Sequence, residues 1–178
     1  MTTQWQEITI ISGEEIDLHL VKTVPGNPAK NWVPAYHFNM ALKGSATPIG
    51  VIDLRIGHNE NLYYGGHIGY AVHSEHRGHH YAGKAVLLLK ELALAHGMER
   101  MTITCNPDNI PSRKTCEYVG AKLKGIVAAL PITICISAGK KKNVSMSWFG
   151  RIIDLQPFKR LFNFNCGERM LYEENRHF

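Results

Sequence analysis

Residues 68–85, IGYAVHSEHRGHHYAGKA, contain the most informative pattern of the sequence. The first five alternate as a β-strand does, and helix-forming residues run over 81–96 until Gly97 supplies a stop. Gly78 lies in the loop between them, and Gly83 lies in the first helical turn. Backbone N–H groups at a helix N-terminus lack intrahelical partners, and the helix dipole favours an anion there. The segment therefore predicts a strand, an anion-binding turn and a helix.

The chain before this segment has the pattern of antiparallel strands. Apolar residues alternate or cluster over 8–11 and 16–21, on either side of a turn, which predicts a hairpin or two short strands. A second hairpin is predicted over 36–42 and 48–56, because turn residues separate two strand-like runs. The stretch 24–34 contains three prolines and predicts a surface loop beside whatever the domain binds.

The chain around and after the segment continues as alternating strands and helices. We expect a loop over 58–66, a strand over 67–72 and a buried strand over 100–105. A second helix over 109–119 ends at a glycine, and a further strand follows over 121–130. This order predicts an α/β domain with a mixed sheet.

Residues 106–121, NPDNIPSRKTCEYVGA, form the second informative segment. They are similar to the stretch Asn-x-x-Ser-x-x-x-x-Glu-x-x-Gly-Phe of the GNAT superfamily of N-acetyltransferases. Four residues match that stretch: Asn109, Ser112, Glu117 and Gly120.

The first segment resembles the acetyl-CoA motif of the same superfamily, (Gln/Arg)-x-x-Gly-x-(Gly/Ala). Arg77 and Ala82 fit the motif, whereas His80 stands where the family usually has its first glycine. The resemblance covers about residues 67–125 and extends weakly back to Ile16. Within the superfamily, the chain resembles the branch that acetylates ribosomal proteins.

This resemblance implies a GNAT fold, with a mixed central sheet of about six to seven strands flanked by helices. It implies acetyl-CoA as co-substrate and no metal. It also implies that the following residues bind the cofactor: Tyr70, Ala71, Val72, Arg77, Gly78, His79, His80, Tyr81, Ala82, Gly83, Asn106, Asn109 and Ser112.

The reaction needs an uncharged amine, a donor for the developing oxyanion and an acid for the leaving thiolate. The resemblance implies that backbone N–H groups of residues 70–72 hold the acetyl carbonyl. Many relatives place a tyrosine acid where this chain has Cys116, and the ribosomal-protein branch can use the serine of Asn-x-x-Ser. Ser112 is therefore the preferred acid and Cys116 the second choice, although Cys116 also fits a small buried core residue.

For the general base, His67 is the first candidate, because it lies on the strand leading to the acetyl site and imidazole titrates in the useful range. The alternative interpretation of His67 is an exposed strand histidine. Glu75 and Asp53 are reserves.

Four histidines, at positions 73, 76, 79 and 80, suggest a metal site. They extend from a strand end through a loop to a helix start, so their spacing does not place three on one face. No set of cysteines or carboxylates completes the site. We therefore predict no metal.

Composition suits one folded domain of 178 residues with a net charge of +5. Residues 1–131 hold 12 Lys and Arg against 11 Asp and Glu, whereas residues 132–178 hold 8 against 4. The basic charge thus belongs mostly to the tail, and without a recognisable nucleic-acid module we expect no nucleic-acid partner. The absence of an apolar span and of a cysteine framework predicts a cytoplasmic protein with reduced thiols and no membrane partner.

The predicted function is direct transfer of acetyl from acetyl-CoA to a primary amine, either a peptide N-terminus or a small amine. The connection 21–36 leaves little room for the two helices that often cover the acceptor site in this family, which favours an open site. The alternative is a non-catalytic acyl-CoA-binding or interaction module, and a nucleic-acid binder comes third. A homodimer is left open.

The predicted domain ends at residue 131, because family resemblance stops there. Residues 132–178 form an atypical basic segment with two open interpretations. Codons allowed for 132–137, read one base earlier, give His-Asn-Asp-Met-Tyr-Gln, which suggests a shifted reading frame and a segment that never evolved to pack. The other interpretation is a native hairpin of 132–138 with 144–149, which supplies the last strand of the sheet.

Overall fold

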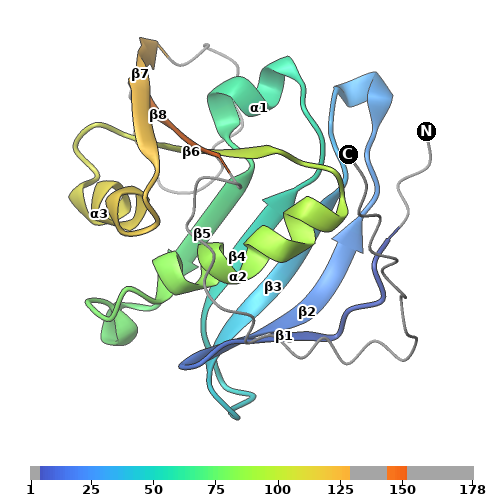
Figure 1. The fold of residues 1–178 in the computed structure, drawn as a ribbon, viewed down its shortest axis with the longest axis vertical. Helices are drawn as coiled ribbons and strands as arrows, with labels where there is room; N and C mark the ends of the chain where they lie inside the picture. Colours follow the sequence, from blue (N-terminus) through green and yellow to red (C-terminus); the bar gives the residue numbers. More distant parts are fainter. Residues whose placement is uncertain (1–4, 129–143, 152–178) are drawn as a thin grey trace, which may run out of the picture.

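The computed structural model describes residues 5–128 and the backbone of residues 144–151. Within these ranges the chain forms one mixed sheet of eight strands, in the order β1-β2-β3-β4-β5-β6-β8-β7, with three α-helices (Figure 1). The elements in chain order are β1 (Ile10–Ser12), β2 (Ile16–Val24), β3 (Ala35–Leu42), β4 (Pro48–Arg55), α1 (Glu60–Gly65), β5 (Ile68–Val72), α2 (Tyr81–Ala95), β6 (Arg100–Cys105), α3 (Ile110–Tyr118), β7 (Lys122–Ala128) and β8 (Val144–Arg151).

The predicted fold class is confirmed, with one more strand than the six to seven expected. β1 to β5 pair antiparallel in sequence order, as the two predicted hairpins require. The helix predicted over 81–96 is α2, and Gly97 ends it with φ of +70°. The helix predicted over 109–119 is α3.

The loop predicted over 58–66 is partly wrong, because it contains the short helix α1. Asn59 caps this helix by accepting a hydrogen bond from the Leu62 N–H at 2.9 Å, and Leu62 is buried. The six-residue length and flanking glycines conceal the helix in the sequence, since one turn shows no apolar period. A turn of 3₁₀ helix, Pro28–Lys30, also lies in the predicted proline-rich loop.

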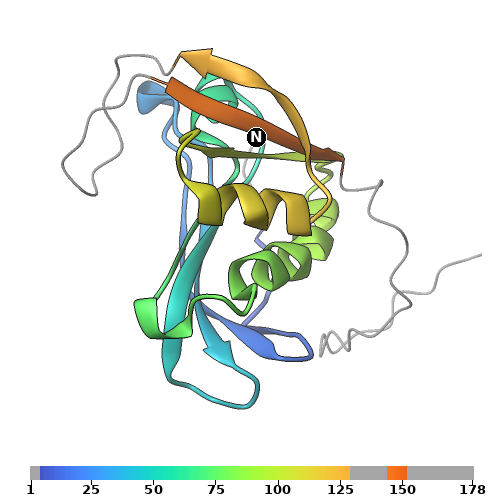
Figure 2. The same cartoon turned by 90° about the vertical axis from the view of Figure 1, so that its left-hand side faces the viewer.

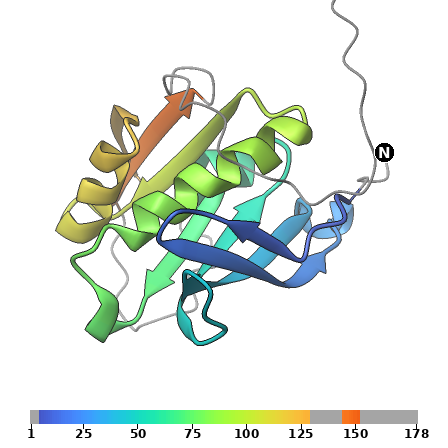
Figure 3. The same ribbon diagram turned by 60° about the horizontal axis from the view of Figure 1, so that its bottom comes forward.

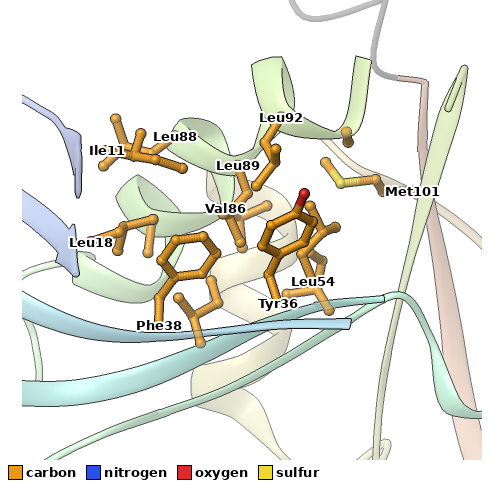
Figure 4. Close-up of a cluster of buried hydrophobic side chains, with 14 of the residues drawn as sticks. Ile11, Leu18, Tyr36, Phe38, Leu54, Val86, Leu88, Leu89, Leu92 and Met101 are labelled. Atoms are coloured by element: carbon orange, nitrogen blue, oxygen red, sulfur yellow. The ribbon is translucent and has the colours of Figure 1, made fainter. Parts of the chain in front are cut away.

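Helices α2 and α3 lie on the same side of the sheet (Figures 2 and 3). The main core forms between α2 and the strands, where one face of each strand points at the helix (Figure 4). From α2 come Val86, Leu88, Leu89 and Leu92, and from the strands Leu18, Tyr36, Phe38 and Leu54. Neither α2 nor α3 covers the opposite face of β3, β4 and β5 (Figure 2).

The sheet opens between its two central parallel strands. β5 and β6 run parallel, and among the described residues their pairing is limited to Ile68 opposite Ile103. Beyond this pair β5 continues for four residues, to Val72. The divergence creates a gap between the strands, and the start of α2 and the whole of α3 lie near it (Figure 1).

The last described strand comes from the atypical C-terminal segment. β8 lies between β6 and β7 and pairs antiparallel with both. A strand here agrees with the native-hairpin interpretation of 144–149, although the proposed partner 132–138 lies outside the described residues, as does 152–178. The domain boundary at 131 and the shifted-frame interpretation therefore stay predictions.

None of the helices in the described ranges is long and apolar enough to cross a membrane.

Candidate active site

The edge of β5 that faces the gap presents backbone N–H groups. The His67 carbonyl and the His73 N–H, which flank β5, both bond to the β4 side at 2.9 Å. Alternate residues of an antiparallel strand point to opposite edges, so Ala71 also bonds toward β4. The N–H groups of Tyr70 and Val72 therefore point toward the gap beside β6. A backbone N–H group without a strand partner suits the oxygen of a carbonyl that becomes negatively charged during a reaction.

The loop after β5 connects this strand to the N-terminus of α2. The Arg77 Nε donates to the Val72 carbonyl at 3.1 Å, which fixes the start of the loop. The His80 side chain makes no capping hydrogen bond to α2, and the first N–H groups of a helix, here those of Tyr81, Ala82 and Gly83, have no intrahelical acceptor. The His79 ring stacks on the Tyr81 ring at 5.3 Å between centroids. This helix end suits a phosphate.

His80 has a backbone conformation that favours glycine. Its φ is +59°, in the left-handed region, and Gly78 has a φ of +91°. The His80 ring stacks on the Tyr118 ring of α3, with centroids 4.8 Å apart and an angle of 10° between the planes. A Cβ on Gly83 would collide with that same Tyr118 ring. Gly83 therefore allows α2 and α3 to approach, and the stack offsets the cost of a side chain at positive φ.

Ser112 and Tyr70 meet across the gap. The Ser112 hydroxyl lies 2.7 Å from the Tyr70 hydroxyl, joining α3 to β5, and Ser112 is only 9% exposed. Burial raises the pKa of the Tyr70 phenol above its ordinary value of 10, so this phenol keeps its proton at neutral pH. The sequence predicted Ser112 but assigned Tyr70 only a backbone role.

Asn109 positions Ser112 through the backbone. Its Oδ1 accepts a hydrogen bond from the Ser112 N–H at 3.2 Å, which makes it the N-cap of α3. The Asn106 carbonyl accepts from the Asn109 N–H at 2.9 Å and closes the preceding turn. The side chains of both asparagines are exposed near the gap.

Cys116 lies in the core. It is fully buried on α3, and its neighbour Cys105 on β6 and its burial both raise the pKa of its thiol. A buried thiol of raised pKa fits the alternative interpretation of Cys116 as a small core residue.

The structure argues against His67 as the general base. The ring is 3% exposed; its Nδ1 accepts from the Thr102 N–H at 2.9 Å, and its Nε2 donates to the Gly57 carbonyl at 3.0 Å. Burial, with the adjacent His58 ring, lowers the pKa of His67 to about 4. Both nitrogens are thus engaged, and His67 joins β6 to the loop after β4. The alternative interpretation of His67 as an exposed strand histidine is wrong, because His67 is buried.

The two reserve bases differ in surroundings. Glu75 lies exposed in the 3₁₀ turn Ser74–His76 and bonds to the Ser74 hydroxyl at 2.9 Å. Asp53 lies on β4, and its Oδ1 is 2.6 Å from His37 Nδ1. Sequence reasoning missed His37, because nothing in a single strand shows which residue lies opposite; only the hairpin register between β3 and β4 does.

Among the described residues, no group of three or more His, Cys, Asp or Glu side chains is placed to hold a metal ion. The four histidines at 73, 76, 79 and 80 belong to this described part of the chain.

A family model described as an acetyltransferase (GNAT) domain matches residues 15–122, more than half of the chain. No curated protein shows a significant sequence match.

Solved structures share the fold. The microcin C7 self-immunity acetyltransferase MccE, in complex with acetyl-CoA and AMP, is 21% identical with a TM-score of 0.50, over 66% of this chain and 61% of MccE. The Vibrio fischeri ribosomal-protein-S5-alanine acetyltransferase is 16% identical with a TM-score of 0.59, over 83% of this chain and 99% of that protein. Mycobacterium smegmatis RimJ, in complex with CoA-disulfide, is 21% identical with a TM-score of 0.55, over 69% of this chain and 56% of RimJ. The chain thus spans less than two thirds of two of these proteins.

Proposed function

The chain belongs to the GNAT family of acetyltransferases, and we propose that it transfers acetyl from acetyl-CoA directly to a primary amine. One observation carries the proposal: β5 diverges from β6 after Ile68, so the N–H groups of Tyr70 and Val72 face a gap beside the uncapped start of α2. The gap combines donors for a carbonyl oxygen with a helix end for a phosphate.

The residues present fit acetyl-CoA. Bound there, it supplies an activated acetyl group as a thioester. The N–H groups at the start of α2, with the loop around Gly78, would hold the pyrophosphate. The N–H groups of Tyr70 and Val72 would polarise the acetyl carbonyl, and the His80–Tyr118 stack would keep α2 and α3 at the spacing that the cofactor needs.

The Ser112–Tyr70 pair is the proposed proton donor for the departing thiolate. The two hydroxyls lie 2.7 Å apart, so a proton given up by Ser112 is replaced from the Tyr70 phenol. The burial that raises the pKa of Tyr70 keeps that phenol protonated as a reserve. Cys116 keeps the second place as acid, and Asn109 positions Ser112.

The proposed acceptor is a peptide N-terminus or an accessible small amine. Support comes from the sheet face opposite α2, which no helix of residues 15–122 covers over β3 and β4 (Figure 2). The name of the V. fischeri relative, an S5-alanine acetyltransferase, makes an N-terminal alanine the natural first probe. A cytoplasmic location, a homodimer and the separate character of residues 132–178 stay predictions.

Release of CoA thiol from acetyl-CoA, measured over a panel of amines and peptides that begins with an unblocked Ala-Ala-Ala-Ala-Ala, tests the proposal. We expect thiol release that depends on both acceptor and protein. Saturating acetyl-CoA that raises the melting temperature without thiol release on any acceptor would favour the non-catalytic acyl-CoA-binding module instead.

Substitution of Gly78 tests the cofactor loop. Gly78→Asp and Gly78→Ala both place a Cβ at a φ of +91°, which Asp tolerates at least as well as Ala, and nothing lies within 4 Å of the added Cβ. Only the Asp variant adds negative charge beside the proposed pyrophosphate, so we expect its Kd for acetyl-CoA to exceed that of the Ala variant by about tenfold, or about 1.4 kcal/mol. Isothermal titration calorimetry measures both. Equal Kd values would remove Gly78 from the phosphate site.

A further inference from the structure

A histidine and an aspartate form a close pair on the sheet face that α2 and α3 leave uncovered. His37 on β3 lies opposite Asp53 on β4, and the His37 Nδ1 is 2.6 Å from the Asp53 Oδ1. Neighbours of His37 along β3, Tyr36 and Phe38, are buried on the α2 side, so alternation places His37 on the other face. The side chains are 32% and 29% exposed, so solvent and ligands can reach them.

Asp53 lies one strand away from the gap and His37 lies two strands away, because the strand order is β3-β4-β5-β6. The strand between Asp53 and the gap presents no side chain beside Asp53. Asp53 is opposite Gly69 on β5. A Cβ on Gly69 would lie 3.5 Å from Asp53 Oδ2 and 3.4 Å from Arg55 Nη2. The Asp53 carboxylate and Arg55 guanidinium therefore extend over Gly69, toward the edge of β5 that carries the acetyl-binding N–H groups.

We propose that the Asp53 carboxylate binds the ammonium group of the acceptor and that His37 receives its proton through an intervening water molecule, an inference that rests on the proposed acetyl transfer. The His37 Nδ1–H donates to the carboxylate, which fixes the tautomer and leaves the Nε2 lone pair for the proton. His37 is the general base, and Asp53 binds the ammonium group and orients the His37 ring. This takes the place of His67, whose two nitrogens are already bonded.

The charged groups around His37 are consistent with an ammonium substrate. Asp53 supplies the carboxylate, and Lys22 lies opposite His37 on β2. The Arg55 guanidinium donates to the Gly66 carbonyl at 3.1 Å, and its Nη2 extends over Gly69 on the same side as the Asp53 carboxylate. From β5, Gly69 adds no charge. The Asp53 carboxylate supplies the negative charge that attracts an ammonium group, and the cations Lys22 and Arg55 flank it.

The proton and electron transfers balance without a further reactant. One ammonium proton passes through water to His37, and the amine lone pair then attacks the thioester carbonyl carbon. The C–S bond breaks, its electron pair leaves with sulfur, and the Ser112–Tyr70 pair gives sulfur a proton. The nitrogen loses its second proton as the amide forms. This proton passes through solvent and reprotonates the Ser112–Tyr70 pair. The proton on His37 is released to water.

Removal of the pair should leave the fold intact. A partly exposed ion pair contributes about 0–1 kcal/mol, because solvent screens it. His37→Gln and Asp53→Asn are therefore expected to melt close to the wild type. His19→Gln is the matched control, because His19 lies on β2 away from the pair and bonds to the Ser45 carbonyl at 3.1 Å.

The test is the pH dependence of kcat with unblocked Ala-Ala-Ala-Ala-Ala as acceptor. At pH 7 we expect His37→Gln to lower kcat by about 10- to 100-fold, because the α-amine is mostly protonated below its pKa of about 8. At pH 9 the amine is neutral without help, so the variant should come within about threefold of wild type. Asp53→Asn should show a smaller loss with the same pH trend, and His19→Gln should match wild type.

Two results would overturn the assignment of His37 as general base without affecting the proposed acetyl transfer. Equal kcat for His37→Gln and wild type at pH 7 would exclude His37 as the base while acetyl transfer stands. A loss of the same size at pH 7 and pH 9 would show a structural role instead. If the wild type acetylates neither this peptide nor any amine of the panel, the proposed function fails, and the base assignment fails with it.

Discussion

Substitution of Ser112 by alanine or Tyr70 by phenylalanine is expected to lower kcat by about 100-fold, with little change in the Kd for acetyl-CoA. General acid catalysis contributes a rate factor of about 10² to 10⁴. A thiol has a pKa near 8.5, so its thiolate leaves readily and we expect a rate factor near the lower end of that range. The two hydroxyls lie 2.7 Å apart and act as one donor, so the double variant should be little slower than either single one. Steady-state kinetics and calorimetry measure the two quantities.

Cys116→Ser supplies the comparison for this prediction. Cys116 is fully buried, so its replacement should change stability more than kcat. A Ser112→Ala enzyme with full kcat, together with a slow Cys116→Ser enzyme, would transfer the role of acid to Cys116. Independent, multiplying losses at Ser112 and Tyr70 would show that the two hydroxyls do not act as a unit.

Acidification from pH 7 to pH 4 is expected to remove about 3 kcal/mol of folding free energy through His67 alone. The pKa of His67 is lowered to about 4 by burial and by His58, from 6.5 in the unfolded chain. Below pH 6.5 the unfolded chain binds a proton that the folded protein excludes, so stability falls until the pH reaches about 4. Each pH unit in this window costs about 1.4 kcal/mol. Urea denaturation at pH 7, 6, 5 and 4 measures the slope.

His67→Gln removes this titration and should flatten the slope between pH 6.5 and 4, although its stability at pH 7 is lower because a buried hydrogen-bonded ring is lost. Burial also lowers the pKa of His96, which adds a smaller loss of the same sign. Asp17 stays ionised over the range, because its hydrogen bonds outweigh burial and lower its pKa below 3.8. An unchanged slope in the variant would contradict the assignment.

The sequence predicted the elements whose pattern is local. The apolar stripe and Gly97 specify α2, and the alternating runs specify β1 to β5. The two motifs also predicted Ser112 and the N–H groups beside Tyr70, since a strand, a turn and a helix bring these together by short-range geometry. α1 was missed, because a single capped turn has too few residues to show a period.

The roles of the histidines depend on contacts that the sequence does not display. His67 and His37 both lie on or beside strands. The His67 ring is buried and bonded to Thr102 and Gly57. The register of β3 and β4 instead places His37 beside Asp53 on the sheet face that α2 and α3 leave uncovered. His80 departs from the family motif yet keeps a φ of +59°, because Tyr118, 38 positions later, stacks on it. Such long-range pairings decide which titratable group reaches the substrate.

Acetyl transfer without an acetylated enzyme can be followed by mass spectrometry of a reaction with isotope-labelled acetyl-CoA and unblocked Ala-Ala-Ala-Ala-Ala. We expect one labelled acetyl group on the peptide α-amine, none on the protein during turnover, and labelled product that forms about 100-fold more slowly in the Ser112→Ala, Tyr70→Phe double variant. A label that stays on the protein, or labelled acetyl-CoA that binds tightly and leaves the peptide and every amine of the panel unmodified, would contradict direct acetyl transfer.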